Sequence, residues 1–337
     1  MSIRPPGPQG VPLFGNGQQF ADDPFKFMTA CADAYGDVVA FDLGPIPLYM
    51  LTNPQDIKRV LVTEPDRFPK LDLGDDAIYE LLGDGLLLSG GETWQQQRQL
   101  ANPAFHGRRI RTLGDMMVDH TESALTDWAD GDRLDIQIEM ARLTVRIIVT
   151  AMLGTDMSDE RIRTVQENLE PLGARFEPDP FRRIIPNWAP TPENRKFRAA
   201  ISDLESVIDD IIADRRQGGY TAGATTPVDA DTDEPMDLLS LLLRAKDRGE
   251  QTDRQIRDEM MTMLLAGHDT TALMLTYTWY LLSQHPEVER RLHAELDSVL
   301  GGGAPTAADA RQLEYSEQVL NEAMRLYPPV YTRTAVG

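Results

Sequence analysis

The chain has 337 residues, enough for a large hydrophobic core in one or two domains. Its 33 basic and 54 acidic residues give a net charge of −21, which argues against nucleic-acid binding because that function needs a basic surface. The single cysteine, Cys31, excludes an intramolecular disulfide framework. We expect a cytoplasmic protein with no membrane span, because residues 1–17 lack the apolar run of a signal peptide.

The N-terminal part of the chain predicts a small region that contains strands. Residues 1–17 are rich in proline and glycine and predict an extended, semi-rigid lead-in. A short helix is expected over 24–35, followed by strands over 37–42 and 48–52. A further helix over 53–63 has a proline in its first turn, where proline is tolerated.

From residue 93 onward the chain predicts helices separated by clusters of proline and glycine. These helices are expected over 93–101, 108–129, 134–153, 158–170, 192–216, 236–247, 253–285, 286–300 and 315–327. The polar segment 217–235 is predicted to be a flexible loop. The pattern as a whole predicts one domain over residues 1–337, mainly α with a minor β lobe.

The longest predicted helix, from Thr252 to Pro286, is the element around which the rest is organised. Thr252 and Gln255 have the spacing of a capping box, and Pro286 disfavours helix in the residue before it. Residues 260–282 are apolar nearly all round, which is typical of a helix buried in a large core. A membrane span is the alternative, but a histidine, an aspartate and several threonines interrupt the apolar run.

The middle of this helix, residues 266–271, is unusual for a buried helix. Glycine, aspartate and threonine are poor helix formers, and a buried carboxylate needs partners or a raised pKa. Ala266, Gly267 and Thr270 share one face, where two small residues beside a hydroxyl form a notch for a flat group. Asp269 points away from Gly267. The alternative is a kinked core helix whose threonine hydroxyls bond back to the preceding turn.

Two other patterns place polar side chains at helical spacing. Trp94 and Arg98 are four residues apart, so an indole N–H and a guanidinium can both donate to one anionic group. Packing of a tryptophan on an arginine stem is the alternative. Glu322 and Arg325 lie three apart in a helix stopped by Pro328-Pro329, where an ordinary surface ion pair is the alternative.

In this order and at these intervals, the three patterns resemble the cytochrome P-450 family of haem-thiolate monooxygenases, and the resemblance covers the whole chain. The family shows Trp-x-x-x-Arg, then Ala/Gly-Gly-x-Asp/Glu-Thr-Thr in its long central helix, then Glu-x-x-Arg-x-x-Pro-Pro. The resemblance implies the P-450 fold, haem b, and O₂ activation to hydroxylate an apolar organic substrate. It also implies a separate ferredoxin- or flavin-type electron donor.

The resemblance further implies which residues bind the cofactor. Trp94 and Arg98 would bind a haem propionate, and Arg333 could reach the other propionate. Ala266 and Gly267 would let the haem plane and O₂ approach the central helix.

Catalytic and structural roles follow from the same resemblance. Thr270 would hydrogen-bond the oxygen bound at the iron, and Asp269 would help to deliver protons. Glu322 and Arg325 would tie their helix to the loop beneath the haem at a buried junction. His268 occupies a variable position of the family and is expected to be a packing residue.

Apolar side chains expected over the substrate pocket lie in segments 68–88 and 170–191, and most of them are equally compatible with the core. They are Leu81, Leu82, Leu86, Phe176, Phe181 and Trp188.

The chain departs from the family in its haem ligand. The family holds the iron with a cysteine thiolate in a downstream Phe-x-x-Gly-x-Arg-x-Cys-x-Gly loop, a pattern that these 337 residues do not contain. Cys31 belongs instead to an apolar stripe with Met28 and Tyr35, so no metal ligand is assigned. We therefore expect a P-450 fold truncated before the ligand loop, and an inactive 337-residue chain. The alternative function is a non-catalytic P-450-like fragment that lacks haem.

Overall fold

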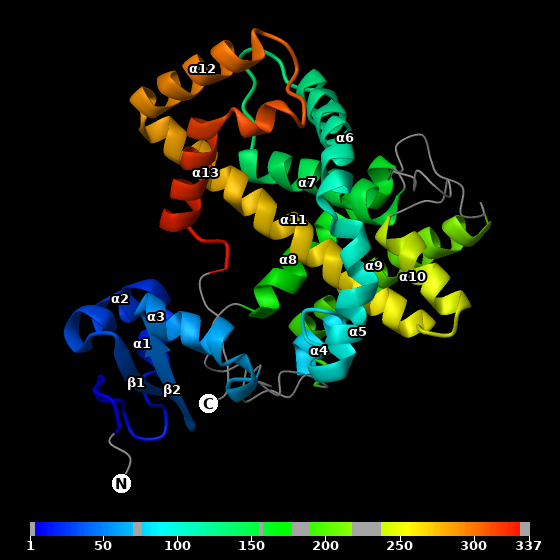
Figure 1. Cartoon of the computed structure of the whole chain (residues 1–337). Helices are drawn as coiled ribbons and strands as arrows, with labels where there is room; N and C mark the ends of the chain where they lie inside the picture. Colours follow the sequence, from blue (N-terminus) through cyan, green and yellow to red (C-terminus); the bar gives the residue numbers. More distant parts are fainter. Residues whose placement is uncertain (1–3, 70–75, 155–157, 177–188, 218–236, 331–337) are drawn as a thin grey trace. The chain divides into compact units, whose positions relative to one another are not determined.

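The computed structural model describes residues 4–69, 76–154, 158–176, 189–217 and 237–330 (Figure 1). Most of these residues are helical and one antiparallel pair of strands is present, which confirms the mainly α fold with a minor β part. The chain divides into two compact units. The first comprises Met1–Asp75, Gly173–Arg195 and Arg333–Gly337, and the second comprises Asp76–Leu172 and Lys196–Thr332. The single domain expected from the sequence remains a prediction.

The first unit is a β-hairpin with short helices. Its elements are α1 (Gly17–Asp22), α2 (Pro24–Tyr35), β1 (Val38–Leu43), β2 (Ile46–Leu51) and α3 (Pro54–Lys58), followed by a π-helical turn, Arg59–Thr63, and a 3₁₀ turn, Pro65–Arg67. Asp23 caps α2 by accepting the Lys26 N–H at 2.9 Å. Phe27 of α2 packs edge-on against Phe41 of β1, so the hairpin and α2 share a small core.

The proline-rich lead-in lies along β1. The Ala40 N–H donates to the Pro6 carbonyl at 2.9 Å, and Gly15 forms a β-bridge with Leu43. A Cβ on Gly7 would lie 1.7 Å from the Ala40 carbonyl oxygen, so only glycine allows this approach. The lead-in is therefore held in place by backbone contacts with β1.

The second unit consists of helices. They are α4 (Asp76–Leu82), α5 (Gly91–Ala101), α6 (Gly107–Thr126), α7 (Ile136–Leu153), α8 (Asp159–Phe176), α9 (Pro192–Gln217), α10 (Leu238–Asp247), α11 (Asp253–Gln284), α12 (Pro286–Leu300) and α13 (Glu314–Leu326). The C-terminal end of α8 and the N-terminal end of α9 are assigned to the first unit. Short 3₁₀ turns cover Asn102–Phe105 and Asp309–Arg311. The predicted loop 217–235 lies almost entirely outside the described residues.

Most predicted helices are confirmed to within a few residues, and the differences have local causes. Helices α1 and α4 were not predicted; both are short and lie beside glycine- and aspartate-rich segments. Helix α8 was predicted to end at residue 170, whereas it continues through Pro171 to Phe176. Proline removes one backbone donor, but neighbouring turns can still carry a helix through it.

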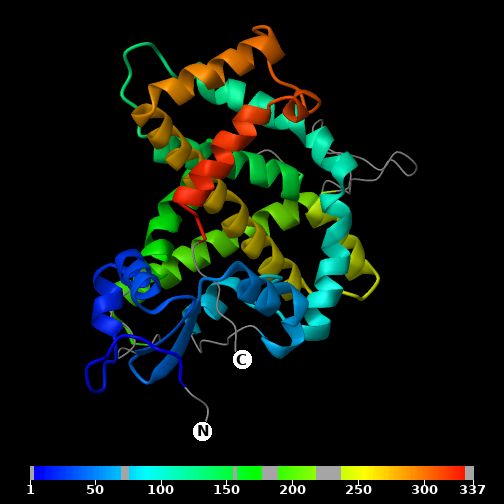
Figure 2. The same ribbon diagram turned by 60° about the vertical axis from the view of Figure 1, so that its left-hand side comes forward.

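The core of the second unit forms where α11 packs on α7, and Figures 1 and 2 both show the two helices side by side. The capping box at the start of α11 is confirmed: Thr252 Oγ1 accepts the Gln255 N–H at 3.2 Å, and Gln255 Oε1 accepts the Thr252 N–H at 2.9 Å. Apolar side chains of both helices, including Val145, Val149 and Met260, are buried between them.

Burial along α11 differs from the expectation. The first half is buried against neighbouring helices, but Trp279 and Tyr280 in the second half are about half exposed. The prediction of a helix buried nearly all round is therefore wrong for this half. α11 contacts α12 and α13, but these two side chains remain partly exposed.

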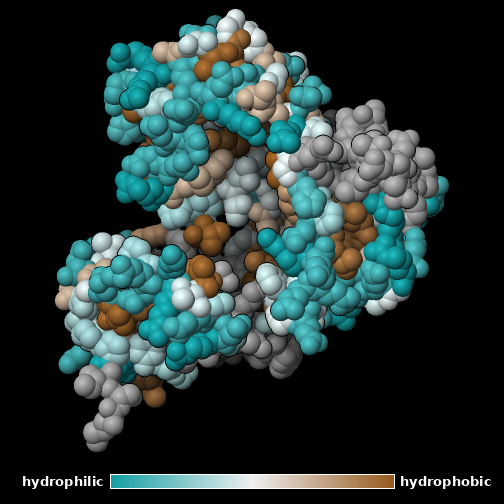
Figure 3. Space-filling view, viewed as in Figure 1, coloured by the Kyte–Doolittle hydropathy of each residue, from teal (hydrophilic) through white to brown (hydrophobic). Residues whose placement is uncertain are grey.

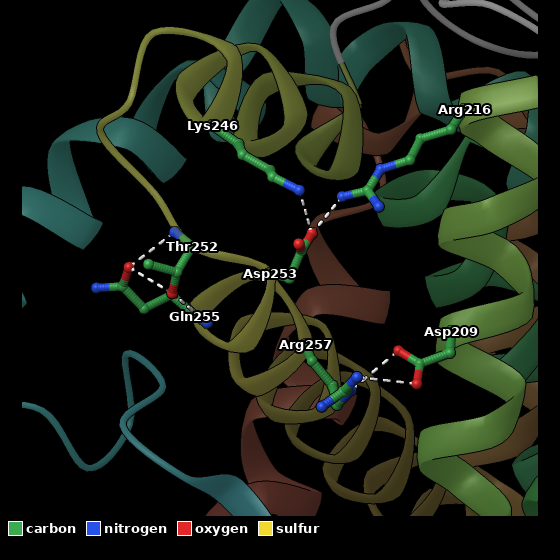
Figure 4. Close-up of polar contacts among 7 residues, drawn as sticks. All are labelled: Asp209, Arg216, Lys246, Thr252, Asp253, Gln255 and Arg257. Atoms are coloured by element: carbon green, nitrogen blue, oxygen red, sulfur yellow. Dashed lines mark hydrogen bonds and ion pairs between the residues drawn. The ribbon is translucent and has the colours of Figure 1, made fainter.

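Charged contacts join α9, α10 and α11 where α11 begins (Figure 4). Asp253 accepts hydrogen bonds from Lys246 of α10, at 2.5 Å, and from Arg216 of α9. Arg257 of α11 makes a two-point contact with Asp209 of α9, at 2.9 Å for each bond. The face of the molecule in Figure 3 is mostly hydrophilic, in keeping with this charged surface.

Candidate active site

The predicted anion-binding pair lies on α5. Trp94 is 38% exposed and Arg98 is also exposed. Among the described residues, neither the indole N–H nor the guanidinium has a hydrogen-bond acceptor. Two donors four residues apart on one helix suit a carboxylate, so the chemistry of this pair fits a haem propionate.

A buried glutamine fixes the helix that carries this pair. Gln97 is 2% exposed and donates from Nε2 to the Asp84 carbonyl at 2.7 Å. The Ser89 hydroxyl donates to Gln97 Oε1 at 2.5 Å. Both partners belong to the segment before α5, so Gln97 holds α5 against its own preceding loop.

The unusual turn of α11 presents part of its surface to solvent. Ala266, Asp269 and Thr271 are exposed, whereas Thr270 is half-buried. The Thr270 hydroxyl donates to the Ala266 carbonyl at 2.8 Å, which is the back-bonding that the sequence analysis gave as the alternative. A hydroxyl that donates in this way still has lone pairs that can accept a hydrogen bond.

Gly267 faces the neighbouring helix α7. A Cβ built on it would lie 2.5 Å from Cδ1 of Ile148, on α7. Its missing side chain therefore permits the close packing of α11 on α7. Its predicted role beside the haem plane remains a prediction.

His268 lies on the buried side of α11. It is 1% exposed, and its Nδ1–H donates to the Leu264 carbonyl at 3.0 Å. Burial lowers the pKa of His268, so the ring is neutral at pH 7. This agrees with the expectation of a packing residue.

Glu322 and Arg325 form the expected ion pair on α13. Two hydrogen bonds of 2.7 Å join them, but the side chains are 54% and 67% exposed. Their expected junction with the loop beneath the haem remains a prediction. The pair lies at one wall of a groove of about 650 Å³ between α11, α12 and α13.

The structure keeps the predicted site residues on separate helices. No hydrogen bond or ion pair between described residues joins Trp94 or Arg98 to the α11 turn, although Gln96 of α5 donates to the Glu250 carbonyl just before α11, at 3.4 Å.

Of the expected pocket residues, Leu81 and Leu82 are buried in the core, which was the alternative for them, and Leu86 is half-buried. Arg333, Phe181, Trp188 and the side chain of Phe176 lie outside the described residues.

Sequence reasoning missed two buried polar residues on α11. Glu259 and Thr262 are each 3% exposed, and Glu259 Oε1 and Thr262 Oγ1 have no hydrogen-bond partner among the described residues. A signal was available, because Glu259 stands at the start of the apolar run. A carboxylate at such a position needs a partner from elsewhere in the fold.

The described residues contain no cluster of three or more histidine, cysteine or acidic side chains suited to a metal ion. Cys31 is buried on α2 in the first unit, and burial raises the pKa of its thiol. It is therefore a protonated side chain packed in a small core.

Comparison with known proteins decides the family. The sequence model of the family described as Cytochrome P450 matches residues 5–335. The chain belongs to the cytochrome P450 family. The mostly helical fold agrees with this assignment, and a P450 uses haem as its cofactor.

Similar P450 proteins occur in Streptomyces. Cyclooctatin synthase of Streptomyces melanosporofaciens is 36% identical over 97% of this chain and 70% of its own length. Cyclooctat-9-en-7-ol 5-monooxygenase of the same organism is 34% identical over 96% of this chain and 68% of its own length. Pentalenene oxygenase of Streptomyces avermitilis is 29% identical over 97% of this chain and 70% of its own length.

One further property of this P450 concerns membranes. Within the described part of the chain, no helix combines the length and apolar character needed to cross a bilayer.

Proposed function

We propose that this P450 is a monooxygenase that hydroxylates a largely hydrocarbon, polycyclic substrate. Family membership supports oxygenase chemistry. The substrate class is supported by two relatives whose names denote oxygenation of pentalenene and of a cyclic alkenol. The observation that carries the proposal is a pair of donors, Trp94 and Arg98, that have no acceptor among the described residues, on a chain that matches the family over nearly its whole length.

Trp94 and Arg98 would hold a propionate of the haem through the indole N–H and the guanidinium. Both side chains are exposed, so binding an anion there does not require a buried contact to break. When bound, the haem supplies the reduction of O₂ that a monooxygenase requires. Ala266 would leave room beside α11 for that flat group, because its side chain is a single exposed methyl.

Asp269 and Thr270 would transfer protons from solvent toward the substrate side of α11. The exposed Asp269 carboxylate can exchange a proton with solvent at its Oδ atoms. Thr270 Oγ1 is held by its bond to the Ala266 carbonyl, so its position is defined while its lone pairs stay available. Neighbouring positions on one turn suit a short proton route from solvent to the substrate side of the helix.

Electrons would come from a separate ferredoxin- or flavin-type protein in the cytoplasm, with O₂ as co-substrate. The alternative function, a haem-free binding fragment, is favoured by one observation. The only thiol of the 337 residues, Cys31, is buried on α2 and protonated, so it does not suit iron ligation.

The deciding experiment extends this chain with the downstream ligand segment of the cyclooctatin synthase relative and loads it with haem. The protein is supplied with an electron donor, isotope-labelled O₂ and pentalenene. We expect labelled oxygen in a hydroxylated product. A haem-loaded, reducible protein that yields no labelled product from a panel of polycyclic hydrocarbons and alcohols would contradict the proposal.

A further inference from the structure

The segment between α4 and α5, residues 83–90, is fastened to α11 by two carboxylates. The backbone N–H of Leu86 donates to Glu259 Oε2 at 3.2 Å, and that of Asp84 donates to Asp258 Oδ2 at 3.1 Å. The partners are 173 and 174 residues apart in the sequence, so both bonds are tertiary contacts. We call this segment the 83–90 loop.

Two glycines let the backbone of the loop lie directly on α11. A Cβ on Gly85 would lie 2.1 Å from Thr262 Oγ1, and one on Gly83 would lie 2.3 Å from the Asp258 carboxylate. Gly83 also has a positive φ of 53°, which other residues rarely adopt. No side chain separates the loop from the helix at these points, so a small displacement of the loop breaks its polar contacts.

The same loop is bound on its other side to α5. Gln97 donates to the carbonyl of Asp84, whose own N–H is bound by Asp258. Gln97 is adjacent to Arg98 and three residues from Trp94. Hydrogen bonds therefore run from Asp258 of α11 through Asp84 to Gln97, on the helix that carries the two exposed donors. Glu259 holds the same loop two residues further along, at Leu86.

We propose that Glu259 is a positioning residue: it fixes the 83–90 loop on α11 and thereby sets where α5 presents Trp94 and Arg98. The inference rests on the haem-binding role proposed above for those two residues. Glu259 is suited to this task because its carboxylate is 3% exposed and the Leu86 N–H is its described hydrogen-bond donor.

The contact has a proton dependence that makes it testable. Burial raises the pKa of Glu259 to about 7, and the Leu86 N–H acts in the opposite direction. The other charged groups around this part of the loop and helix are Asp84, Asp258, Arg254 and Arg257. Glu259 therefore binds its proton more tightly when the loop is closed than when it is open. The equilibrium for loop opening shifts toward the open loop as pH rises from about 4.5 to 7, and it changes no further above pH 7.

The experiment measures hydrogen–deuterium exchange of the loop and α5 amides in the 337-residue chain, corrected for intrinsic exchange rates. In the parent, the opening of Leu86 should increase by about tenfold per pH unit between pH 5 and 7. Glu259→Gln keeps an acceptor but cannot titrate, so this pH dependence should vanish. Glu259→Leu removes the acceptor, and exchange should rise at least about tenfold at Leu86 and also in the α5 turn at Trp94.

The matched control is Glu287→Gln on the exposed surface of α12, which should exchange like the parent. Unchanged α5 exchange in a folded Glu259→Leu protein would overturn the proposal. If that variant does not fold, a pH profile of Glu259→Gln identical to the parent would overturn it.

A second readout separates this inference from the proposed function. Haem is titrated into each protein and followed by quenching of tryptophan emission. Weaker binding in Glu259→Leu and in Arg98→Gln is the expected result. If Arg98→Gln binds haem as the parent does, the haem-binding role fails, whereas the exchange data still decide whether Glu259 positions α5.

Discussion

Arg325 donates from Nε and Nη2 to the two carboxylate oxygens of Glu322, each at 2.7 Å, on the solvent-exposed side of α13. The hydrogen bonds from Arg325 lower the pKa of Glu322. The contribution of the pair to stability is thus present above the ordinary glutamate pKa of 4.5 and is lost as pH falls through the lowered value.

Replacing Arg325 by alanine should leave the thermal midpoint of the 337-residue chain nearly unchanged at pH 7. Exposed ion pairs contribute little, because water and salt screen them. Circular dichroism melts at pH 3 and pH 7 check this, and the difference between parent and variant should be smaller at pH 3. A large loss of stability would show that the pair makes contacts beyond those described.

The ion pair between Arg215 and Asp237 should contribute much more to stability than the exposed pair, because both side chains are buried. Arg215 Nη2 lies 3.3 Å from Asp237 Oδ2 and also donates to the carbonyls of Leu153 and Gly154. Asp237→Ala leaves a buried guanidinium without its counter-charge and should lower the unfolding free energy by about 3–5 kcal/mol. Urea titration measures this, with the exposed Asp297→Ala as control; similar values for the two variants would contradict the reasoning.

Gly267→Ala should reveal how closely α11 approaches α7. Alanine gains about 1 kcal/mol of helix propensity, but its Cβ would lie 2.5 Å from Ile148 Cδ1. Overpacking typically costs about 1–3 kcal/mol, so we expect a net loss of stability. Ile148→Ala removes both close atoms, Cδ1 at 2.5 Å and Cγ1 at 2.7 Å, so in a double-mutant cycle Gly267→Ala should cost less stability in its presence. Additive effects would show that the two positions do not meet.

Thr270→Ala should uncouple oxygen chemistry from haem binding in the extended, haem-loaded protein. Haem affinity should be unchanged, whereas more of the reducing equivalents should appear as peroxide and less as product. Thr276→Ala is the matched control, because its hydroxyl makes the same back-bond, to the Ala272 carbonyl at 2.7 Å. Equal product yields per reductant in the parent and both variants would contradict the role of Thr270.

Cys31→Ala should not alter how the 337-residue chain binds haem. The thiol is buried on α2 and burial raises its pKa, so thiolate is scarce at pH 7. Carbon monoxide is added to the reduced, haem-treated protein and the Soret band is recorded. A thiolate-type band that disappears in Cys31→Ala would overturn this prediction.

Many helix boundaries could be predicted from local sequence signals. The capping box of Thr252 and Gln255 and the proline stop at Pro286 lie within a few residues of the ends they define, so the bounds of α11 could be predicted. Burial could not be predicted in the same way. The exposure of Ala266 and Asp269 depends on which helices lie opposite, and an apolar pattern does not specify them.

The candidate site shows the same division. Spacing alone placed Trp94 and Arg98 on one helix, and it paired Glu322 with Arg325. The contact of Glu259 with Leu86 could not be predicted from local sequence patterns, because 173 residues separate the two positions. Leu86 was predicted to contribute its apolar side chain to the substrate pocket, whereas its contact with Glu259 uses the backbone N–H.

Charged contacts hold α9 near both of its ends. Its apolar side is buried from Phe197 to Ile211, but apolar contacts have no preferred direction and tolerate sliding. The directional ties to α10 and α11 fall in the last third, at Asp209, Arg215 and Arg216. Near the other end of α9, Arg198 donates to Glu80 of α4 at 3.1 Å, so rotation of α9 about either end would break a charged contact.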